Sequence, residues 1–459
     1  MDRWLRAALD YVPQWVEFQM RMTEQPGCSF AIAHKGKVVA EHAFGHADAP
    51  RGVALTPRHR FRVASHSKTF TAAGLMLLRE RGRVTLDDAV GRHVGGLHAR
   101  VAKVTLAQLL SHSAGLVRDG RDAGQWSDRR PFLDEAELRA DLAAGPVIEP
   151  NSRFKYSNHG YGLLGLVIEA VTGEPYTDWI AREVVAASGL EETVPDGPPP
   201  ARMPFARGHT PKWLTGARLV IPGDNPTRAL ASATGFISTA ADLARFFGSL
   251  LPTARASVLS PASRREMTRR QWRDPHSSLE RWYGLGTISG TVAEWDWVGH
   301  SGGFQGTITR TVALPALDLA VSFLTNAADG LSHVWLEGAL HILRAHAKHG
   351  APSRGALPWA GRWWSLWGPV DIVPVNGKLL ACNPALANPV MDASEIAMGG
   401  RAAGGESRGV IALANGFASH GESARLERDA RGRAKALWLG GTRLLPEAIA
   451  AKEVGRRYG

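Results

Sequence analysis

Strand patterns lie on both sides of a long helical segment, and this order limits the folds that the chain can adopt. The strand patterns are Ser29–Ile32, Val38–Phe44, Thr307–Leu314 and Leu319–Thr325. Helical periodicity dominates between them, over 67–80 and from about 105 to 250, and it returns over Val334–His346. Such an order predicts an α+β domain, in which one sheet is built from both ends of the segment.

Helical periodicity ends at Lys348–Gly355, a stretch with glycine, proline and serine that we expect to be a linker. Beyond it the sequence predicts short strands, with turn signals at Asn376-Gly377, Asn415-Gly416 and Asp429–Gly432 and a strand over Ala434–Leu439 after the last of these turns. We therefore expect a catalytic domain over 1–347, a linker over 348–355 and a small antiparallel β-domain over 356–459. We expect its tryptophans to pack in the core rather than line a ligand cavity, namely Trp359, Trp363, Trp364 and Trp367.

Charge and composition narrow the classes of function. The net charge is +11, but the basic residues form no run interleaved with aromatic residues, and we expect no nucleic-acid binding. Cys28 and Cys382 are the only cysteines, so neither a disulfide framework nor a thiolate metal site is expected. The N-terminal segment has a helical period that we expect Pro13 to end or kink. It has the pattern of neither a signal peptide nor a membrane span, so we expect a cytoplasmic protein without membrane association.

Ser65 and Lys68 form an S-x-x-K pattern at the start of the helical segment 67–80. Three residues make nearly one helical turn, so we expect the Lys68 amine on the same face as the Ser65 hydroxyl. The helix N-terminus adds partial positive charge that favours an oxyanion, and the Ser65 amide is one of its free donors. These features suit a nucleophilic serine, although single pairs of this kind also arise by chance.

Tyr156 and Asn158 lie in a polar loop before a helix that we expect to begin near Gly160. A phenol is a poor base in water, but a neighbouring ammonium group favours its phenolate. The Asn158 amide both donates and accepts hydrogen bonds. Taken alone, a Tyr-x-Asn sequence is only a surface turn in most proteins.

The segment Gly299–Gly303 has two competing interpretations. As G-x-S-x-G it is a nucleophile elbow on Ser301, with a downstream base among His333, His341 and His346. An elbow must lead from a strand into a helix, whereas this segment leads into a predicted hairpin. We therefore expect Ser301 not to be the nucleophile.

As H-x-G, the same segment places the His300 imidazole and the Gly303 amide at the rim of a strand, where Gly302 lets substrate approach closely. S-x-x-K, Y-x-N and H-x-G in this order resemble the motif set of serine β-lactamases, penicillin-binding proteins and their esterase and D-aminopeptidase relatives. Four further stretches look like this family, FRVASHSKTFTA (61–72), TLAQLLSHSAGL (105–116), TGFISTAADLARF (234–246) and YGLG (283–286). The resemblance covers about 30–346.

The resemblance implies a class C β-lactamase-like fold. We expect a transpeptidase-like domain, with an antiparallel sheet flanked by helices and an all-helical subdomain, followed by a small antiparallel β-barrel or lipocalin-like domain. It also implies acyl transfer without a metal or organic cofactor. Ser65 would be the nucleophile and Lys68 and Tyr156 its proton-transfer partners. The implied substrate-binding residues are Asn158, His300, Gly302 and Gly303, with the Ser65 and Gly303 amides as the oxyanion hole.

The substrate is constrained by one departure from the family. The third motif usually supplies a lysine that meets a substrate carboxylate, whereas a histidine such as His300 is mostly neutral at pH 7. We expect a hydrolase of small esters, amides or D-amino-acid-containing peptides. The alternatives are an acyltransferase, a DD-carboxypeptidase or β-lactamase, and a non-catalytic sensor on the same scaffold. The expected partner is a small-molecule or short-peptide substrate, and a homo-oligomer is left open.

Overall fold

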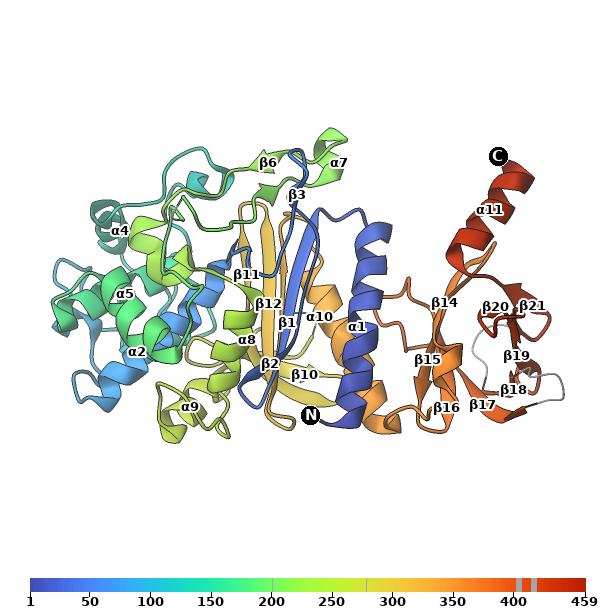
Figure 1. Ribbon diagram of the computed structural model, residues 1–459. Coiled ribbons are helices and arrows are strands. Elements are labelled where there is room, and N and C mark those ends of the chain that lie inside the picture. The colour runs from blue at the N-terminus through green and yellow to red at the C-terminus, as the bar shows by residue number, and fades with distance from the viewer. Residues whose placement is uncertain (200, 278, 402–406, 414–418) are drawn as a thin grey trace. The chain divides into compact units, whose positions relative to one another are not determined.

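Two compact units make up the chain in the computed structural model, Gln25–Leu336 and Met1–Glu24 together with Glu337–Gly459 (Figure 1). The structure describes residues 1–199, 201–277, 279–401, 407–413 and 419–459. The boundaries expected from the sequence, 1–347, 348–355 and 356–459, differ from this division, because they place the N-terminal helix in the catalytic domain. They stay a prediction of the domain organisation. The turn predicted at Asn415-Gly416 lies outside the described residues.

The unit Gln25–Leu336 is built on an antiparallel nine-stranded sheet in the order β3-β2-β1-β13-β12-β11-β10-β9-β8. Its strands are β1 (Gly27–His34), β2 (Lys37–Asp48), β3 (Val53–Ala54), β8 (Trp272–Arg273), β9 (Arg281–Tyr283), β10 (Ile288–Val292), β11 (Trp295–Phe304), β12 (Thr307–Leu314) and β13 (Leu319–Thr325). Two small pairs accompany it, β4 (Phe61–Arg62) with β7 (Ile237–Ser238) and β5 (Gly208–His209) with β6 (Val220–Ile221). Because β1 pairs with β13, the sheet joins both ends of the segment, as predicted.

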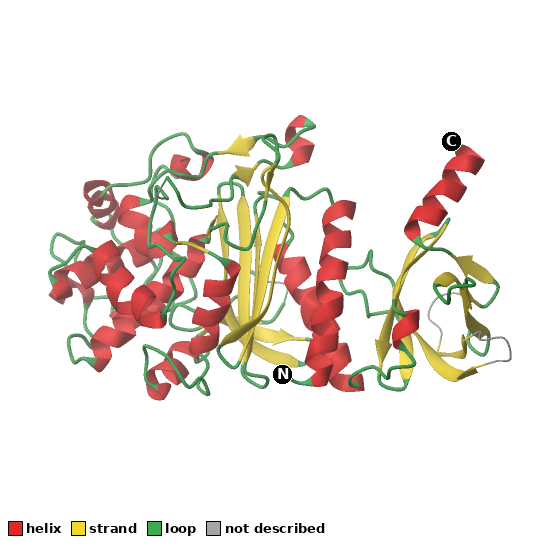
Figure 2. Cartoon of the chain, viewed as in Figure 1, coloured by secondary structure: helices red, strands yellow, loops and turns green. Residues whose placement is uncertain are grey.

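Eight helices complete the described part of this unit and include a helical region beside the sheet (Figure 2). They are α2 (Ser67–Glu80), α3 (Leu106–Leu110), α4 (Glu135–Leu142), α5 (Asn158–Thr172), α6 (Tyr176–Ile180), α7 (Lys212–Thr215), α8 (Ala240–Ser249) and α9 (Pro261–Thr268). The α+β prediction, with helices and an antiparallel sheet, is confirmed.

Local sequence signals explain several of these boundaries. Lys35 and Gly36 both have positive φ, 52° and 76°, which suits the tight β1–β2 hairpin. The Thr105 side chain caps α3 in a capping box. The helix α5 begins after Ser157, whose Oγ accepts from the amide of Gly160.

Helix α2 lies in the core of this unit. Every residue from Ser67 to Leu78 is buried, so this helix is apolar on more than one face. Phe70 stacks on Phe236 and Phe246 at ring-centroid distances of 4.4 and 3.9 Å. A helix held on all sides fixes the position of any functional group on its first turn.

The other unit contains a nearly closed, barrel-shaped antiparallel sheet of eight strands in sequence order. The strands are β14 (Gly361–Ser365), β15 (Gly368–Val375), β16 (Lys378–Cys382), β17 (Ser394–Arg401), β18 (Ser407–Leu413), β19 (Ser423–Arg428), β20 (Ala434–Leu439) and β21 (Thr442–Leu444). Two backbone hydrogen bonds between Trp364 and Leu445 connect its first and last strands. The predicted β-barrel is confirmed. Trp359 and Trp363 are in its core, as predicted, whereas the prediction was wrong for Trp367, which is 94% exposed.

Helix α1 (Arg3–Met22) belongs to this second unit and continues through Pro13, so of the two expected effects of this proline, an end or a kink, the helix end does not occur. Proline inside a helix costs about 3 kcal/mol, because it removes one hydrogen bond and clashes with the preceding turn. Burial of the apolar face opposes this loss, since Val12 and Trp15 are fully buried. The Trp15 indole also donates to the carbonyl oxygen of Pro384 over 3.1 Å.

Two helices near the C-terminus complete the description. Helix α10 (Ser332–His349) contains the boundary between the units and extends into the predicted linker. Helix α11 (Glu447–Tyr458) was not predicted. None of its described residues is buried, so it has no apolar periodicity for a sequence pattern to detect.

Candidate active site

Ser65 lies in a short 3₁₀ turn, Ala64–His66, directly before α2. Ala64 has a φ of 49°, a left-handed conformation that costs a non-glycine residue about 1–2 kcal/mol. Strand β11 closely approaches this turn, and a Cβ at Gly302 would lie 2.2 Å from the carbonyl oxygen of Val63. Ser65 therefore precedes the α-helix rather than opening it, and a glycine is required where β11 passes.

Lys68 is fully buried behind Ser65. Its Nζ lies 3.1 Å from Ser65 Oγ, which confirms that the two side chains share one face. Nζ also donates to Oδ1 of Asn158 over 2.7 Å and to the carbonyl oxygen of Ala233 over 2.8 Å. Three oxygens thus surround the amine.

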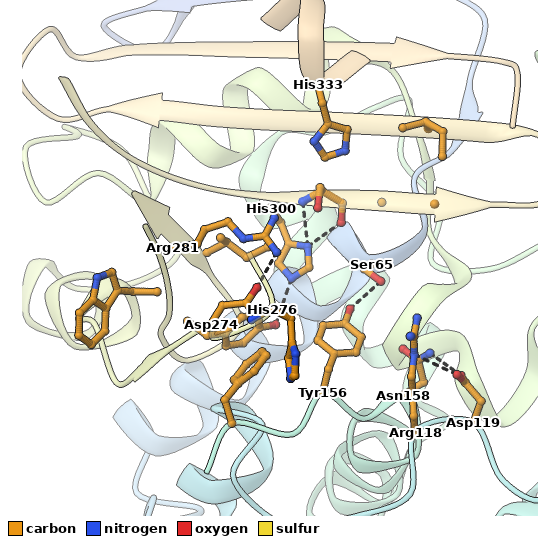
Figure 3. A pocket seen from close by; sticks show the side chains of 18 of the residues that line it. Ser65, Arg118, Asp119, Tyr156, Asn158, Asp274, His276, Arg281, His300 and His333 are labelled. Atoms are coloured by element: carbon orange, nitrogen blue, oxygen red, sulfur yellow. Dashed lines mark hydrogen bonds and ion pairs between the residues drawn. The ribbon is translucent and has the colours of Figure 1, made fainter. Parts of the chain in front are cut away.

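The Tyr156 hydroxyl donates to Ser65 Oγ over 2.8 Å (Figure 3). Ser157 fixes the approach to α5, because its amide donates to Nδ1 of His112 and its hydroxyl caps the helix. The rings of His112 and Tyr156 lie 4.1 Å apart. Ser65 is therefore within hydrogen-bond reach of both Lys68 and Tyr156.

Burial favours the uncharged forms of both Lys68 and Tyr156. It lowers the pKa of Lys68 well below the usual 10.5, with the charge of Asp119 opposing this shift and that of Arg118 adding to it. Burial raises the pKa of Tyr156 above its usual value, although Nζ of Lys68 lies 4.8 Å from the phenol ring. The expectation of a favoured Tyr156 phenolate was wrong, because the cost of burying the phenolate exceeds the effect of its neighbours. Both shifts favour the uncharged forms of the two groups beside Ser65, an amine and a phenol.

Strand β11 carries the third motif. His300 is 2% exposed, and its Nε2 lies 3.0 Å from the Tyr283 hydroxyl. Burial, together with His66 and Lys68, lowers the pKa of His300 well below 6.5, so the imidazole is neutral at pH 7. A Cβ at Gly303 would meet only Ile308, at 3.6 Å, so this glycine borders open space. The motif presents no fixed positive charge.

A cavity of about 570 Å³ opens in front of Ser65. It is lined by Ser65, Arg118, Asp119, Trp126, Phe154, Tyr156, Asn158, Asp274, His276, Arg281, Trp282, Tyr283, Ile288, His300, Ser301, Gly302, Gly303, Ile308 and His333. Figure 3 shows Ser65 and Tyr156 between Arg118 and Asp119 on one side and Asp274 and Arg281 on the other. Six of the seven predicted site residues line this cavity, and the seventh, Lys68, lies directly behind Ser65. Their catalytic and binding roles stay predictions.

Sequence reasoning missed several groups in the cavity. Asp119 follows the SHSAGL stretch by three residues, and Tyr283 begins the YGLG stretch, so both lie beside segments that resemble the family. Arg281 pairs with Asp274 over 2.5 Å, and no motif marks either residue. Isolated charged residues become recognisable only when the fold brings them together.

Ser301 lies inside β11, which continues to Phe304 and then pairs with β12. A nucleophile elbow needs a sharp turn from a strand into a helix, and here a strand leads into a strand. The alternative with Ser301 as nucleophile therefore lacks its structural context.

A family model described as beta-lactamase matches residues 12–338. The chain belongs to the beta-lactamase family. The resemblance inferred from the three motifs is confirmed.

The chain is also similar to three known proteins. Penicillin-binding protein 4* of Bacillus subtilis is 32% identical over 35% of this chain and 36% of its own length. The octameric penicillin-binding protein homologue from Pyrococcus abyssi covers 95% of this chain and 99% of its own, with a TM-score of 0.65 and 21% identity. A D-stereospecific amidohydrolase from Streptomyces sp. covers 73% and 98%, with a TM-score of 0.60 and 25% identity. The chain matches about a third of the length of its curated relatives.

Membrane-spanning helices and clusters of metal ligands are both absent from the described residues. No helix among them is long and apolar enough to cross a membrane. Within the same residues, no group of three or more His, Cys, Asp or Glu side chains is placed to hold a metal ion.

Proposed function

We propose that this member of the beta-lactamase family hydrolyses small esters, amides or D-amino-acid-containing peptides through an acyl-enzyme on Ser65. The observation that carries the proposal is the position of Ser65 Oγ, 3.1 Å from Nζ of Lys68 and 2.8 Å from the Tyr156 hydroxyl, at the floor of a cavity. A nucleophile, a neutral base and a neutral acid are the groups that acyl transfer needs.

In the first step Lys68 takes the proton of the Ser65 hydroxyl as Oγ bonds to the substrate carbonyl carbon. The carbonyl π electrons move to its oxygen, giving a tetrahedral oxyanion. When the oxyanion collapses, the bond to the leaving group breaks, and Tyr156 donates a proton to that group. Lys68 then passes the proton that it took from Ser65 to the Tyr156 phenolate, so both groups regain their starting states. Water attacks the acyl-enzyme in a second, similar step and releases the acid.

The oxyanion needs donors in place before the reaction. We assign the amides of Ser65 and Gly303 to this task, because Ser65 lies at the start of α2 and Gly303 lines the cavity in front of it. Loss of one such donor typically costs about 2.7–4 kcal/mol of transition-state stabilisation.

The charges of the cavity support small uncharged or amine-bearing substrates over those with a C-terminal carboxylate. His300 is neutral, and the described residues that line the cavity include no lysine. The guanidinium of Arg281 is paired with Asp274, and that of Arg118 with Asp119. The similar amidohydrolase from Streptomyces sp. is D-stereospecific by description, which agrees with a D-amino-acid amide as one substrate class.

Parallel rates on three substrates test this proposal. We expect p-nitrophenyl butyrate and D-alanine p-nitroanilide to be cleaved faster than nitrocefin, and Ser65→Ala to abolish all three activities. A dominant rate on nitrocefin would contradict the proposed substrate class. Transfer of the acyl group to an added amine in preference to water would assign an acyltransferase instead.

Two further proposals concern the whole molecule. The homologue from Pyrococcus abyssi is octameric, which supports a homo-oligomer here, and light scattering after gel filtration tests this proposal.

Cys28 and Cys382 are buried and unpaired, as the reducing conditions of a cytoplasm allow. This supports a cytoplasmic location, which fractionation of the native host tests.

A further inference from the structure

Asp119 lies on the cavity wall beside Asn158, and its side chain is 15% exposed. Its Oδ1 accepts hydrogen bonds from Nδ2 of Asn158 at 2.6 Å and from the Trp126 indole at 2.9 Å. Its Oδ2 lies 3.1 Å from Nε of Arg118. Since an ionised carboxylate only accepts hydrogen bonds, the Asn158 atom that faces it must be the amino group.

This contact fixes the direction of the Asn158 side chain. While Nδ2 donates to Asp119, Oδ1 is directed at Nζ of Lys68, 2.7 Å away. A reversed amide would instead aim an N–H donor at the Lys68 amine and an oxygen at the carboxylate. The orientation of an amide follows from its partners, and here both partners favour the same one.

The orientation of Asn158 in turn directs the lone pair of Lys68. A neutral amine has two N–H donors and one lone pair, and Nζ is close to three oxygens. The oxygens of Asn158 and Ala233 only accept, so they take the two N–H donors. The hydroxyl of Ser65 both donates and accepts, so it is the group left to face the lone pair.

We propose that Asp119 is a positioning residue that holds the Asn158 amide so that the lone pair of Lys68 faces Ser65. This inference rests on the proposed function, in which Lys68 accepts the Ser65 proton. Asp119 itself transfers no proton and touches no reacting atom in this step. Its effect on acylation passes entirely through Asn158.

The charges around Lys68 separate this role from a simple electrostatic one. The ionisable groups around it are Asp119, Arg118, His112, His300, Tyr156 and Tyr161, and burial raises the pKa of the Tyr161 phenol as well. Burial holds both histidines and both phenols neutral, so Asp119 and Arg118 carry the nearby charge. The Asp119 charge raises the pKa of Lys68, so its removal lowers this pKa further and leaves more neutral amine. A slower reaction would then come from lost orientation and not from protonation.

The test measures acylation by p-nitrophenyl butyrate, whose acyl group carries no charge for Asp119 to recognise. We expect Asp119→Ala, which removes the acceptor of the Asn158 hydrogen bond, to lower the plateau acylation rate about 10- to 100-fold, the range for a lost hydrogen bond to a charged group. Asp119→Asn keeps an amide oxygen that can accept from Asn158, so its plateau should fall less. The acid limb of the pH–rate profile should move to lower pH. Rates are referred to the folded fraction, which urea unfolding supplies. The matched control is Asp122→Asn, since Asp122 lies nearby in the same loop with its side chain 62% exposed.

Each outcome decides the inference. An unchanged plateau in Asp119→Ala overturns it, as does a loss that Asp122→Asn shares. A loss confined to D-alanine p-nitroanilide also overturns it, because Asp119 would then bind the substrate ammonium group. If the acid limb of the pH–rate profile moved but the plateau rate did not fall, Asp119 would have only an electrostatic effect on Lys68, and the positioning role would be overturned. If the wild-type protein is not acylated at Ser65, the proposed function itself fails.

Discussion

The Tyr156 hydroxyl donates its hydrogen bond to Oγ of Ser65 over 2.8 Å, from a ring whose pKa burial raises. A phenol in that state keeps its proton at neutral pH, so it holds a proton to give and is not available as a phenolate base. Lys68, on the other side of Ser65, has a pKa that burial lowers, so it is suited to take one. This asymmetry assigns the base and the acid in the proposed mechanism.

Tyr156→Phe should therefore lower the rate of substrate cleavage, and the loss should be larger the more the leaving group needs a proton. On D-alanine p-nitroanilide we expect a loss of about 10²–10⁴-fold, the usual range for general acid catalysis. The loss on p-nitrophenyl butyrate should be much smaller, since p-nitrophenolate leaves without protonation. Equal losses on both substrates would show that Tyr156 acts on the Ser65 proton instead.

Lys68→Arg tests the base. A guanidinium stays protonated at every accessible pH, so this variant keeps a cation but has no lone pair for Ser65. We expect acylation to slow about 10²–10⁴-fold. In the wild type the rate should rise with pH until Lys68 is neutral, and because burial lowers its pKa this rise should end well below pH 10.5. A near-normal rate for Lys68→Arg would remove Lys68 from the mechanism.

Alanine substitutions at the neighbouring residues Gly302 and Gly303 test how closely β11 packs against the chain beside it. A methyl group at Gly302 would lie 2.2 Å from the Val63 carbonyl oxygen, whereas one at Gly303 would make ordinary contact with Ile308 at 3.6 Å. Gly302→Ala should lower the free energy of unfolding by about 1–3 kcal/mol, the usual cost of overpacking. Gly303→Ala should change it by less than about 0.5 kcal/mol. Urea unfolding measures both, and equal changes would contradict the close approach of β11.

The predicted strands and helices were most accurate where periodicity and end signals agree. Thr307–Leu314, Leu319–Thr325, Ser67–Glu80 and Ala434–Leu439 were predicted from the sequence and have these bounds in the structure. The first three are core elements whose burial leaves a clear apolar pattern, and turn residues delimit the fourth.

Prediction failed where tertiary contacts outweigh local preference. The helix α1 keeps Pro13 because its buried face holds it. The helix α11 is a different case, since it has helix-forming alanines but no buried face, so local preference and not burial favours it. At the site, an ordered motif set located the groups around Ser65. Asp119 has no such motif, and its relation to Asn158 depends on a loop whose course the sequence does not reveal.

Acid should destabilise the fold through buried neutral histidines. His66 is fully buried, and burial lowers its pKa to about 4, whereas an unfolded histidine has a pKa near 6.5. Between these values the unfolded state binds a proton that the folded state does not, so the free energy of unfolding falls as pH falls. From pH 7 to pH 5 the contribution of His66 is about 2 kcal/mol. Urea unfolding at both pH values should show a smaller loss for His66→Gln, and the same loss in both proteins would contradict this origin.

The central claim is that Ser65 is the acylated nucleophile. The direct measurement is intact-protein and peptide mass spectrometry after reaction with a fluorophosphonate, on the wild type, Ser65→Ala and Ser301→Ala. We predict one adduct on the peptide that contains Ser65, in the wild type and in Ser301→Ala, and no adduct in Ser65→Ala. An adduct that persists in Ser65→Ala, or that is lost in Ser301→Ala, would contradict the account.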